Sequence, residues 1–177
     1  DFPKSEQLKD WDLLPTKPDW SGGIQDVWTP GEKAAQERLE HFCDELLQDY
    51  EAGRDRPFAD ETSQLSPRLR WGEISPFRAW HTANAYASRR KTIPDAAIRT
   101  FRRELVWRDF NYHLLYHFGR LERDNFNDRF DGFSWRRSAA DLQAWQKGLT
   151  GYPIVDAGMR QLWQTGWMHN RVRMIVG

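Results

Sequence analysis

The sequence repeats one local pattern at the points where helical spacing of apolar residues begins. At Thr29-Pro30, Ser66-Pro67 and Ser75-Pro76 a hydroxyl residue stands directly before a proline. Serine and threonine are preferred at the helix N-cap, and proline is preferred at the first helical position. At Thr29 the pattern extends to Glu32, which completes a capping box. Repeated helix starts of this kind predict a chain built from helices.

Apolar residues then recur three or four positions apart, and no stretch alternates apolar and polar residues for long enough to predict a sheet. The predicted fold class is therefore all-α. Residues 1–30 hold four prolines, three tryptophans and no sustained period, so 1–28 is predicted as an irregular lead-in with one short helix. The helices expected after it cover residues 29–50 with an end near Gly53, 66–72, 75–87, 94–117, 138–145, 153–163 closed by Gly166, and 167–177.

Composition excludes several classes of protein. No run of 18 apolar residues is present to span a membrane, and residues 1–12 do not form a signal peptide. The one cysteine, Cys43, excludes an internal disulfide and a multi-cysteine metal site, and its place in a helical pattern predicts a buried thiol. The 26 basic and 26 acidic residues give a net charge of zero, which does not exclude local charged patches.

The segment 62–66 is the first candidate site. It places hydroxyls and free backbone N–H groups at a predicted helix start, an arrangement that suits a phosphate or pyrophosphate. Plain capping would explain Ser66 equally well, because serine is a preferred cap in any helix. Both interpretations remain open on the residues alone.

The second candidate lies on the helix predicted over 94–117. Glu104 and Arg108 are four apart, which is the spacing of an ordinary helical ion pair. With Trp107 and Asn111 the same residues would instead form a platform, on which a planar ring stacks while polar groups contact its edge. The sequence leaves both interpretations open.

The third candidate is the C-terminal run 167–174. On a helix, Trp167, Asn170, Arg171 and Met174 would share one face, and the chain has three arginines and no acid from residue 157 onward. A stripe of tryptophan and methionine is typical of a core, whereas the interleaved polar groups suit a flat heteroaromatic ligand with phosphates nearby. His169 has no further ligand at metal-binding spacing, so no metal site is predicted.

Taken together, six segments resemble one family, the DNA photolyase/cryptochrome flavoproteins. They are YEAGRD (50–55), TSQLSP (62–67), WGEISP (71–76), RELVWRDF (103–110), TGYPIVDAGMR (150–160) and TGWMHNR (165–171). The match extends from Tyr50 to Arg171 and is identified as the N-terminal part of the all-helical FAD-binding domain. The resemblance implies that residues 29–177 form only part of that domain. The α/β antenna domain before it and the second flavin-contacting half after it are then expected in a longer parent protein.

The resemblance also implies roles for individual residues. The residues expected to contact FAD are Tyr50, Thr62, Ser63, Gln64, Leu65, Ser66, Phe101, Arg108, Trp167, Asn170 and Arg173. The catalytic positions expected beside a pyrimidine dimer are Glu104, Trp107, Asn170 and Met174, with Trp107 stacking on it. The expected DNA contacts are Arg54, Glu104, Trp107, Asn111 and Arg171, and Trp135 resembles the outer member of an electron-transfer chain. Gln64 departs from the family pattern, in which many members have arginine.

The implied reaction is light-driven: photoexcited reduced FAD gives an electron to a cyclobutane pyrimidine dimer flipped out of DNA, and the dimer splits. The expected partner is dimer-containing DNA, with no membrane and no metal. The resemblance further implies a monomer in the cytoplasm, on the nucleoid if the source is bacterial, and an antenna chromophore only in the full-length parent. One alternative is a cryptochrome photoreceptor on the same scaffold, and another is a helical module that binds DNA or a protein without flavin.

The ten tryptophans divide between these roles. Trp107 and Trp167 are predicted to face a ligand and Trp135 to carry electrons. The tryptophans predicted to pack helices together are Trp71, Trp80, Trp145 and Trp163. Trp11, Trp20 and Trp28 have no predicted role.

Overall fold

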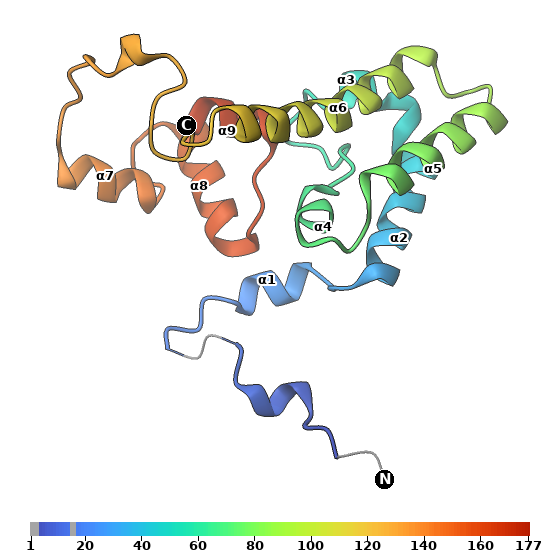
Figure 1. Cartoon of the computed structure of the whole chain (residues 1–177), viewed down its shortest axis with the longest axis horizontal. Helices are drawn as coiled ribbons and strands as arrows, with labels where there is room; N and C mark the ends of the chain where they lie inside the picture. Colours follow the sequence, from blue (N-terminus) through green and yellow to red (C-terminus); the bar gives the residue numbers. More distant parts are fainter. Residues whose placement is uncertain (1–3, 15–16) are drawn as a thin grey trace. The chain divides into compact units, whose positions relative to one another are not determined.

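The computed structural model describes residues 4–14 and 17–177, and within them it contains helices and no β-strand (Figure 1). This confirms the all-α prediction. The α-helices are α1 (Gly22–Val27), α2 (Glu32–His41), α3 (Tyr50–Gly53), α4 (Ser66–Trp71), α5 (Pro76–Arg89), α6 (Asp95–His117), α7 (Ala139–Gln146), α8 (Pro153–Thr165) and α9 (Asn170–Val176). Shorter helical turns are η1 (Leu8–Trp11), η2 (Phe42–Leu46), η3 (Leu47–Asp49) and η4 (Asp128–Phe130).

The chain forms two compact units. One is Pro30–Leu142, and the other joins the residues up to Thr29 with Gln143–Gly177. We call them the central unit and the terminal unit. The stretch predicted as a lead-in contains η1 and α1, and α1 packs against α8 within the terminal unit.

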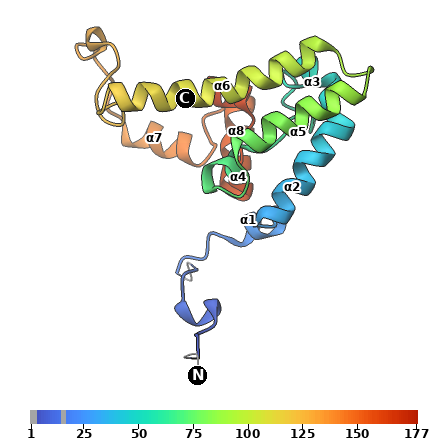
Figure 2. The ribbon, with the colours of Figure 1, turned by 45° about the vertical axis from the view of Figure 1, so that its right-hand side comes forward.

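A continuous helical run from Glu32 to Gly53 and a hairpin of α5 and α6 build the central unit (Figure 2). The run ends at Gly53 as predicted, but its middle, Phe42–Leu46, is a π-helix, which the apolar spacing did not predict. Its apolar face and those of α5 and α6 form the core. The buried core residues are Ala35, Leu39, Phe42, Cys43, Leu47, Tyr50, Leu65, Ile74, Ala79, Ala83, Ile93, Ile98, Phe101 and Leu105.

Cys43 is buried in this core as a free thiol, which confirms the prediction. Burial away from water disfavours the thiolate, and the nearby carboxylates of Asp44 and Glu40 disfavour it further. Together they raise the pKa of Cys43 to about 12. The thiol therefore stays neutral at physiological pH.

Several predicted helix starts are confirmed by their hydrogen bonds. The Ser75 hydroxyl accepts from the backbone N–H of Arg78 at 3.1 Å, and α5 begins at Pro76. Pro94 is the N-cap of α6, and the Ser138 hydroxyl accepts from the Asp141 N–H at 3.2 Å before α7. These starts depend only on neighbouring residues, which is why the sequence predicts them.

The predicted cap at Thr29 is wrong. Helix α2 begins at Glu32 with Gly31 as its N-cap, and Gly31 has a φ of 108°. Only glycine adopts such a backbone conformation readily, so the chain turns into the helix at Gly31 instead of at Thr29. The Gly31 N–H donates to the Glu73 carboxylate at 3.0 Å, which fixes this turn to the segment between α4 and α5.

Two tryptophans predicted to pack helices together are exposed. Trp71 is 79% exposed at the end of the short helix α4, and Trp163 is 74% exposed on α8. For these two residues the prediction is wrong, because helical spacing does not say which face a partner covers. Trp80 packs against the central core, and the Trp145 indole donates to the Val176 carbonyl at 3.1 Å, which links α7 to α9.

Helices α8 and α9 pack closely in the terminal unit. Gly158 lies where a Cβ would overlap Val172, and Met159, Met168 and Val172 form a small buried cluster. The Trp28 indole donates to the Thr165 carbonyl at 2.7 Å and so holds the end of α1 against the end of α8. In the part of the chain that the structure describes, no helix combines the length and apolarity needed to cross a membrane.

Candidate functional site

The centre of the predicted site on α6 is Glu104. Its carboxylate accepts a hydrogen bond from the Arg54 guanidinium, which lies just after α3. The predicted ion pair with Arg108 is therefore not the interaction that Glu104 makes, and that interpretation is wrong. A helix brought alongside α6 supplies the closer cation, which spacing on α6 alone could not indicate.

Arg54 is held on two sides. Its side chain is 13% exposed, and its guanidinium lies 5.9 Å from the centre of the Tyr50 ring. Burial is the largest single influence and acts to lower the pKa of Arg54, but the hydrogen bond to Glu104 together with the electrostatic interactions with Tyr50, Glu104 and Asp55 outweighs it, so the net shift is upward. Arg54 is thus a permanent cation beside the Glu104 carboxylate.

Trp107 presents its ring to solvent on α6. It is 54% exposed and meets Phe110 edge to face, with ring centres 5.7 Å apart. Glu104, Trp107 and Asn111 are spaced three and four residues apart, so they share one face of the helix. This face can offer a stacking surface flanked by a carboxylate and an amide, as the platform interpretation requires.

Arg108 points towards α4 and the next turn of its own helix. Its Nη2 lies 3.5 Å from the Leu69 carbonyl and 3.4 Å from the Tyr112 hydroxyl, and its guanidinium covers the Tyr112 ring. It therefore links α4 to α6 while its side chain stays partly exposed.

The segment 62–66 is a half-buried loop that enters α4 at Ser66. Gln64 has a φ of 52°, and the Leu65 N–H donates to the Ser63 hydroxyl at 3.4 Å. The Thr62 Oγ1 is buried and finds no hydrogen-bond partner among the described residues. A buried hydroxyl without a partner is costly, so this atom is a candidate donor to a ligand.

The capping interpretation of Ser66 is wrong. Helix α4 has Leu65 as its N-cap, Ser66 is already its first residue, and no side chain caps it. The turn at Gln64 brings the chain into the helix one residue earlier than the Ser-Pro pattern predicts. Because α4 has only six residues, its dipole is small. The polar groups of the preceding loop therefore contribute more than the helix dipole to the electrostatics at the N-terminal end of α4.

Three residues expected to contact a cofactor lie in the core. Tyr50, Leu65 and Phe101 are buried, and the Tyr50 and Phe101 ring centres are 5.9 Å apart. Burial is the main cause that raises the pKa of Tyr50 to about 12, so its hydroxyl stays protonated. These three side chains belong to the buried core of the central unit.

Trp135 lies in the segment between η4 and α7. It is exposed, and its ring centre is 4.6 Å from that of Phe133. The pair is accessible to solvent, as an outer electron-transfer position would require.

The terminal unit carries the remaining predicted residues. Trp167 precedes α9 instead of lying on it, because His169 is the N-cap and its ring Nδ1 accepts from the Arg171 N–H at 3.1 Å. The prediction that Trp167 shares a helical face with Asn170 is therefore wrong. Asn170, Arg173 and Met174 are exposed, and Met174, at 68% exposure, does not belong to a core stripe.

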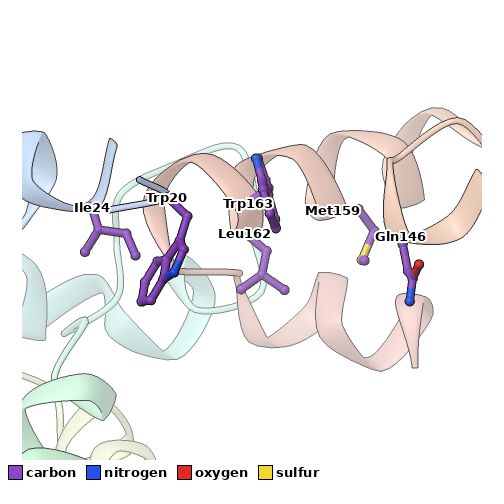
Figure 3. A pocket seen from close by; sticks show the side chains of 6 residues that line it. All are labelled: Trp20, Ile24, Gln146, Met159, Leu162 and Trp163. Atoms are coloured by element: carbon purple, nitrogen blue, oxygen red, sulfur yellow. The ribbon is translucent and has the colours of Figure 1, made fainter. Parts of the chain in front are cut away.

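Two features of the structure were not predicted. Arg38 and Asp60 bind the 62–66 loop, although only the loop itself carries a sequence signal. A pocket of about 180 Å³ also opens in the terminal unit, and Figure 3 shows the Trp20 and Trp163 rings along it. The residues that line it are Trp20, Ile24, Gln146, Met159, Leu162 and Trp163.

Within residues 4–14 and 17–177, no three His, Cys, Asp or Glu side chains gather closely enough to hold a metal ion.

Comparison with known proteins gives matches over nearly the whole chain. The family described as the FAD binding domain of DNA photolyase matches residues 101–177. A deoxyribodipyrimidine photo-lyase of Agrobacterium fabrum is 55% identical over 175 residues, which are 99% of this chain and 36% of the relative. The chain thus spans about a third of the length of the relatives it matches.

Solved structures agree with the sequence matches. The crystal structure of a bacterial class III photolyase from Agrobacterium tumefaciens has a TM-score of 0.91 and 57% identity, over 99% of this chain and 36% of that one. A cryptochrome from Synechocystis has a TM-score of 0.77 and 32% identity, over 85% of this chain and 31% of that one.

Proposed function

Because the chain belongs to the DNA photolyase/cryptochrome family, as part of its helical FAD-binding domain, we propose that it serves in light-driven repair of cyclobutane pyrimidine dimers in DNA. Relatives named deoxyribodipyrimidine photo-lyase support this proposal over most of the chain. The activity is proposed for a longer protein that carries this sequence, since the chain covers 36% of its Agrobacterium relative.

The residues of the 62–66 loop fit a bound FAD. The observation that supports this most is the buried, unpartnered Thr62 hydroxyl, which can donate to a phosphate oxygen. The exposed Ser66 hydroxyl, with no capping role, lies close by in the chain. Tyr50, Leu65 and Phe101, which belong to the core of the central unit, are also proposed to contact the cofactor. Arg108, Trp167, Asn170 and Arg173 are each proposed to contact the flavin.

Bound FAD would supply, on illumination, the electron that splits the dimer. The chain's own residues bind and orient the DNA lesion. Trp107 is proposed to stack on the flipped-out bases, and Glu104 and Asn111 to bind their polar edges. Asn170 and Met174 are proposed as further residues that contact the lesion, and Trp135 is proposed to pass electrons from the surface.

Cations would bind the DNA backbone. Arg54 and Arg171 are proposed to contact phosphates, which is consistent with guanidinium chemistry. Arg171 also places a nitrogen 3.8 Å from the Met174 sulfur, so a phosphate contact and a lesion contact would lie on neighbouring turns of α9.

Light-dependent repair of a dimer-bearing oligonucleotide tests this function. The full-length protein with bound, reduced FAD should restore the intact bases under blue light and not in the dark. Bound reduced FAD without repair would favour the cryptochrome alternative. The similarity of this chain to the Synechocystis cryptochrome structure is consistent with that alternative. Tight, salt-dependent DNA binding by a protein without flavin absorbance would favour the flavin-free helical module. The monomeric state and the cellular location stay predictions.

A further inference from the structure

Arg38, on α2, binds the 62–66 loop from a distant part of the sequence. Its Nε donates to the Ser63 carbonyl at 3.0 Å, and its Nη2 donates to the Thr62 carbonyl at 2.8 Å. The same Nη2 lies 3.1 Å from the Asp60 carboxylate. One guanidinium therefore joins two consecutive loop carbonyls and a side chain.

This arrangement uses a property that lysine lacks. Guanidinium has five N–H donors in one rigid plane, so it can bind neighbouring acceptors at fixed angles. The Arg38 side chain is 19% exposed, which limits competition from water. The contact is therefore suited to hold the loop in one shape.

The loop needs such support because of its backbone. Gln64, directly after the two bound carbonyls, has a φ of 52°, a region that non-glycine residues adopt at a cost. The Gln64 amide donates to the same Asp60 carboxylate at 2.8 Å. Arg38 thus binds the two carbonyls that precede the strained residue, and Asp60 binds the side chain of that residue.

These contacts also change what the loop offers to an anion. Carbonyl oxygens repel phosphate, and here two of them are occupied by a cation. The Thr62 hydroxyl is left buried and without a partner among the described residues, so it is a donor that remains for an anion, beside the exposed Ser66 hydroxyl. At position 64 the side chain is an amide, which brings no charge of its own to a phosphate.

We propose that Arg38 is a positioning residue for the FAD pyrophosphate, which holds the Thr62–Ser66 loop in its binding conformation through its paired hydrogen bonds to the Thr62 and Ser63 carbonyls. This inference rests on the flavin site proposed above and adds a residue outside the segments that carry the family resemblance.

The test compares two variants of the full-length apoprotein, Arg38→Gln and Arg38→Lys. Titrations with FAD and with riboflavin separate binding of the pyrophosphate from binding of the ring. Hydrogen exchange without flavin measures opening of the loop at Ser63, Gln64 and Leu65. Arg78→Gln is the matched control, since this arginine of α5 donates to the Gln36 side chain.

Both Arg38 variants are expected to lower FAD affinity at least tenfold, to change riboflavin affinity less than threefold, and to speed exchange in the loop. The control should change none of these. Unchanged FAD affinity, an equal loss for both flavins, or full affinity in Arg38→Lys would overturn the proposal. If the wild-type protein binds no FAD, the proposed function fails, and loop exchange still decides whether Arg38 holds the loop.

Discussion

The Arg54 guanidinium donates a hydrogen bond to the Glu104 carboxylate, joining α3 to α6 across fifty residues of sequence. The family pattern assigns these two residues to different parts of DNA, a phosphate and the damaged bases. In the structure each serves as the partner of the other. The pair therefore keeps two proposed site residues in place while it also fastens α3 to the long helix.

A double-mutant cycle of Arg54→Gln and Glu104→Gln should give a coupling energy of about 0.5–3 kcal/mol, because the pair is partly buried and charge-assisted. Urea denaturation measures the free energy of unfolding of each variant. Arg103→Gln with Glu104→Gln is the control cycle, since Arg103 is 62% exposed and its Nε lies 3.9 Å from the carboxylate. The control pair should couple weakly. Equal coupling energies in both cycles would show that the Arg54–Glu104 contact stabilises the protein no more than the exposed Arg103–Glu104 contact.

Trp107→Ala should weaken binding of dimer-containing DNA by about 1–3 kcal/mol, the usual loss for a base stacked on an aromatic ring. Fluorescence anisotropy with a dimer-bearing duplex measures the affinity. Trp71→Ala is the matched control, because Trp71 is also exposed but lies outside the proposed site. If both variants bind as tightly as the wild type, Trp107 does not stack on the lesion.

Gly158→Ala should destabilise the protein by about 1–3 kcal/mol, even though alanine is the better helix former. The added methyl would overlap Val172 and force α8 and α9 apart. Gly22→Ala on α1 is the control, since the added carbon would meet no atom within 4 Å beyond its chain neighbours and the backbone of its own helix. A gain in melting temperature for Gly158→Ala would contradict the close packing of these helices.

Asp156 should make stability depend on pH in the acid range. Its carboxylate accepts from the Thr150 hydroxyl at 2.6 Å and from the Thr150 and Gly151 N–H groups, which lowers the pKa of Asp156 below 3.8. A lowered folded-state pKa gives stability that is present above the unfolded value and is lost as pH falls through the folded value.

The melting temperature of Asp156→Asn should therefore fall furthest below that of the wild type above pH 5, and the difference should shrink below pH 3. Thr150→Val, which removes one donor, should show a smaller loss of the same kind. A difference that stays constant from pH 7 to pH 2.5 would exclude this role for the carboxylate.

Local signals predicted much of the fold. The cap at Ser75, the start after Pro94 and the end at Gly166 each depend on residues within one turn, and all three are confirmed. The cap at Ser66 failed although its pattern is the same as that at Ser75. The difference is the positive φ of Gln64, which other parts of the chain stabilise and which no local pattern predicts.

The sequence predicted which residues belong to the candidate site, but not which of them contact one another. The family motifs include Arg54, Glu104 and Trp107, but they did not indicate that Arg54 and Glu104 bind each other. Arg38 carries no motif, because its contact with the loop spans 24 and 25 positions of sequence. Such contacts depend on how α2 packs against the rest of the central unit, and no local sequence pattern specifies that packing.

The FAD affinity of Thr62→Val in the full-length protein tests the flavin site most directly. The substitution removes the buried hydroxyl that lacks a partner and keeps the side-chain shape. The apoprotein should become more stable by about 1 kcal/mol, since an unsatisfied polar group is lost. FAD affinity should fall at least tenfold, since a hydrogen bond to phosphate is lost. A stabilised variant with undiminished FAD affinity would contradict the proposal that this loop holds the cofactor.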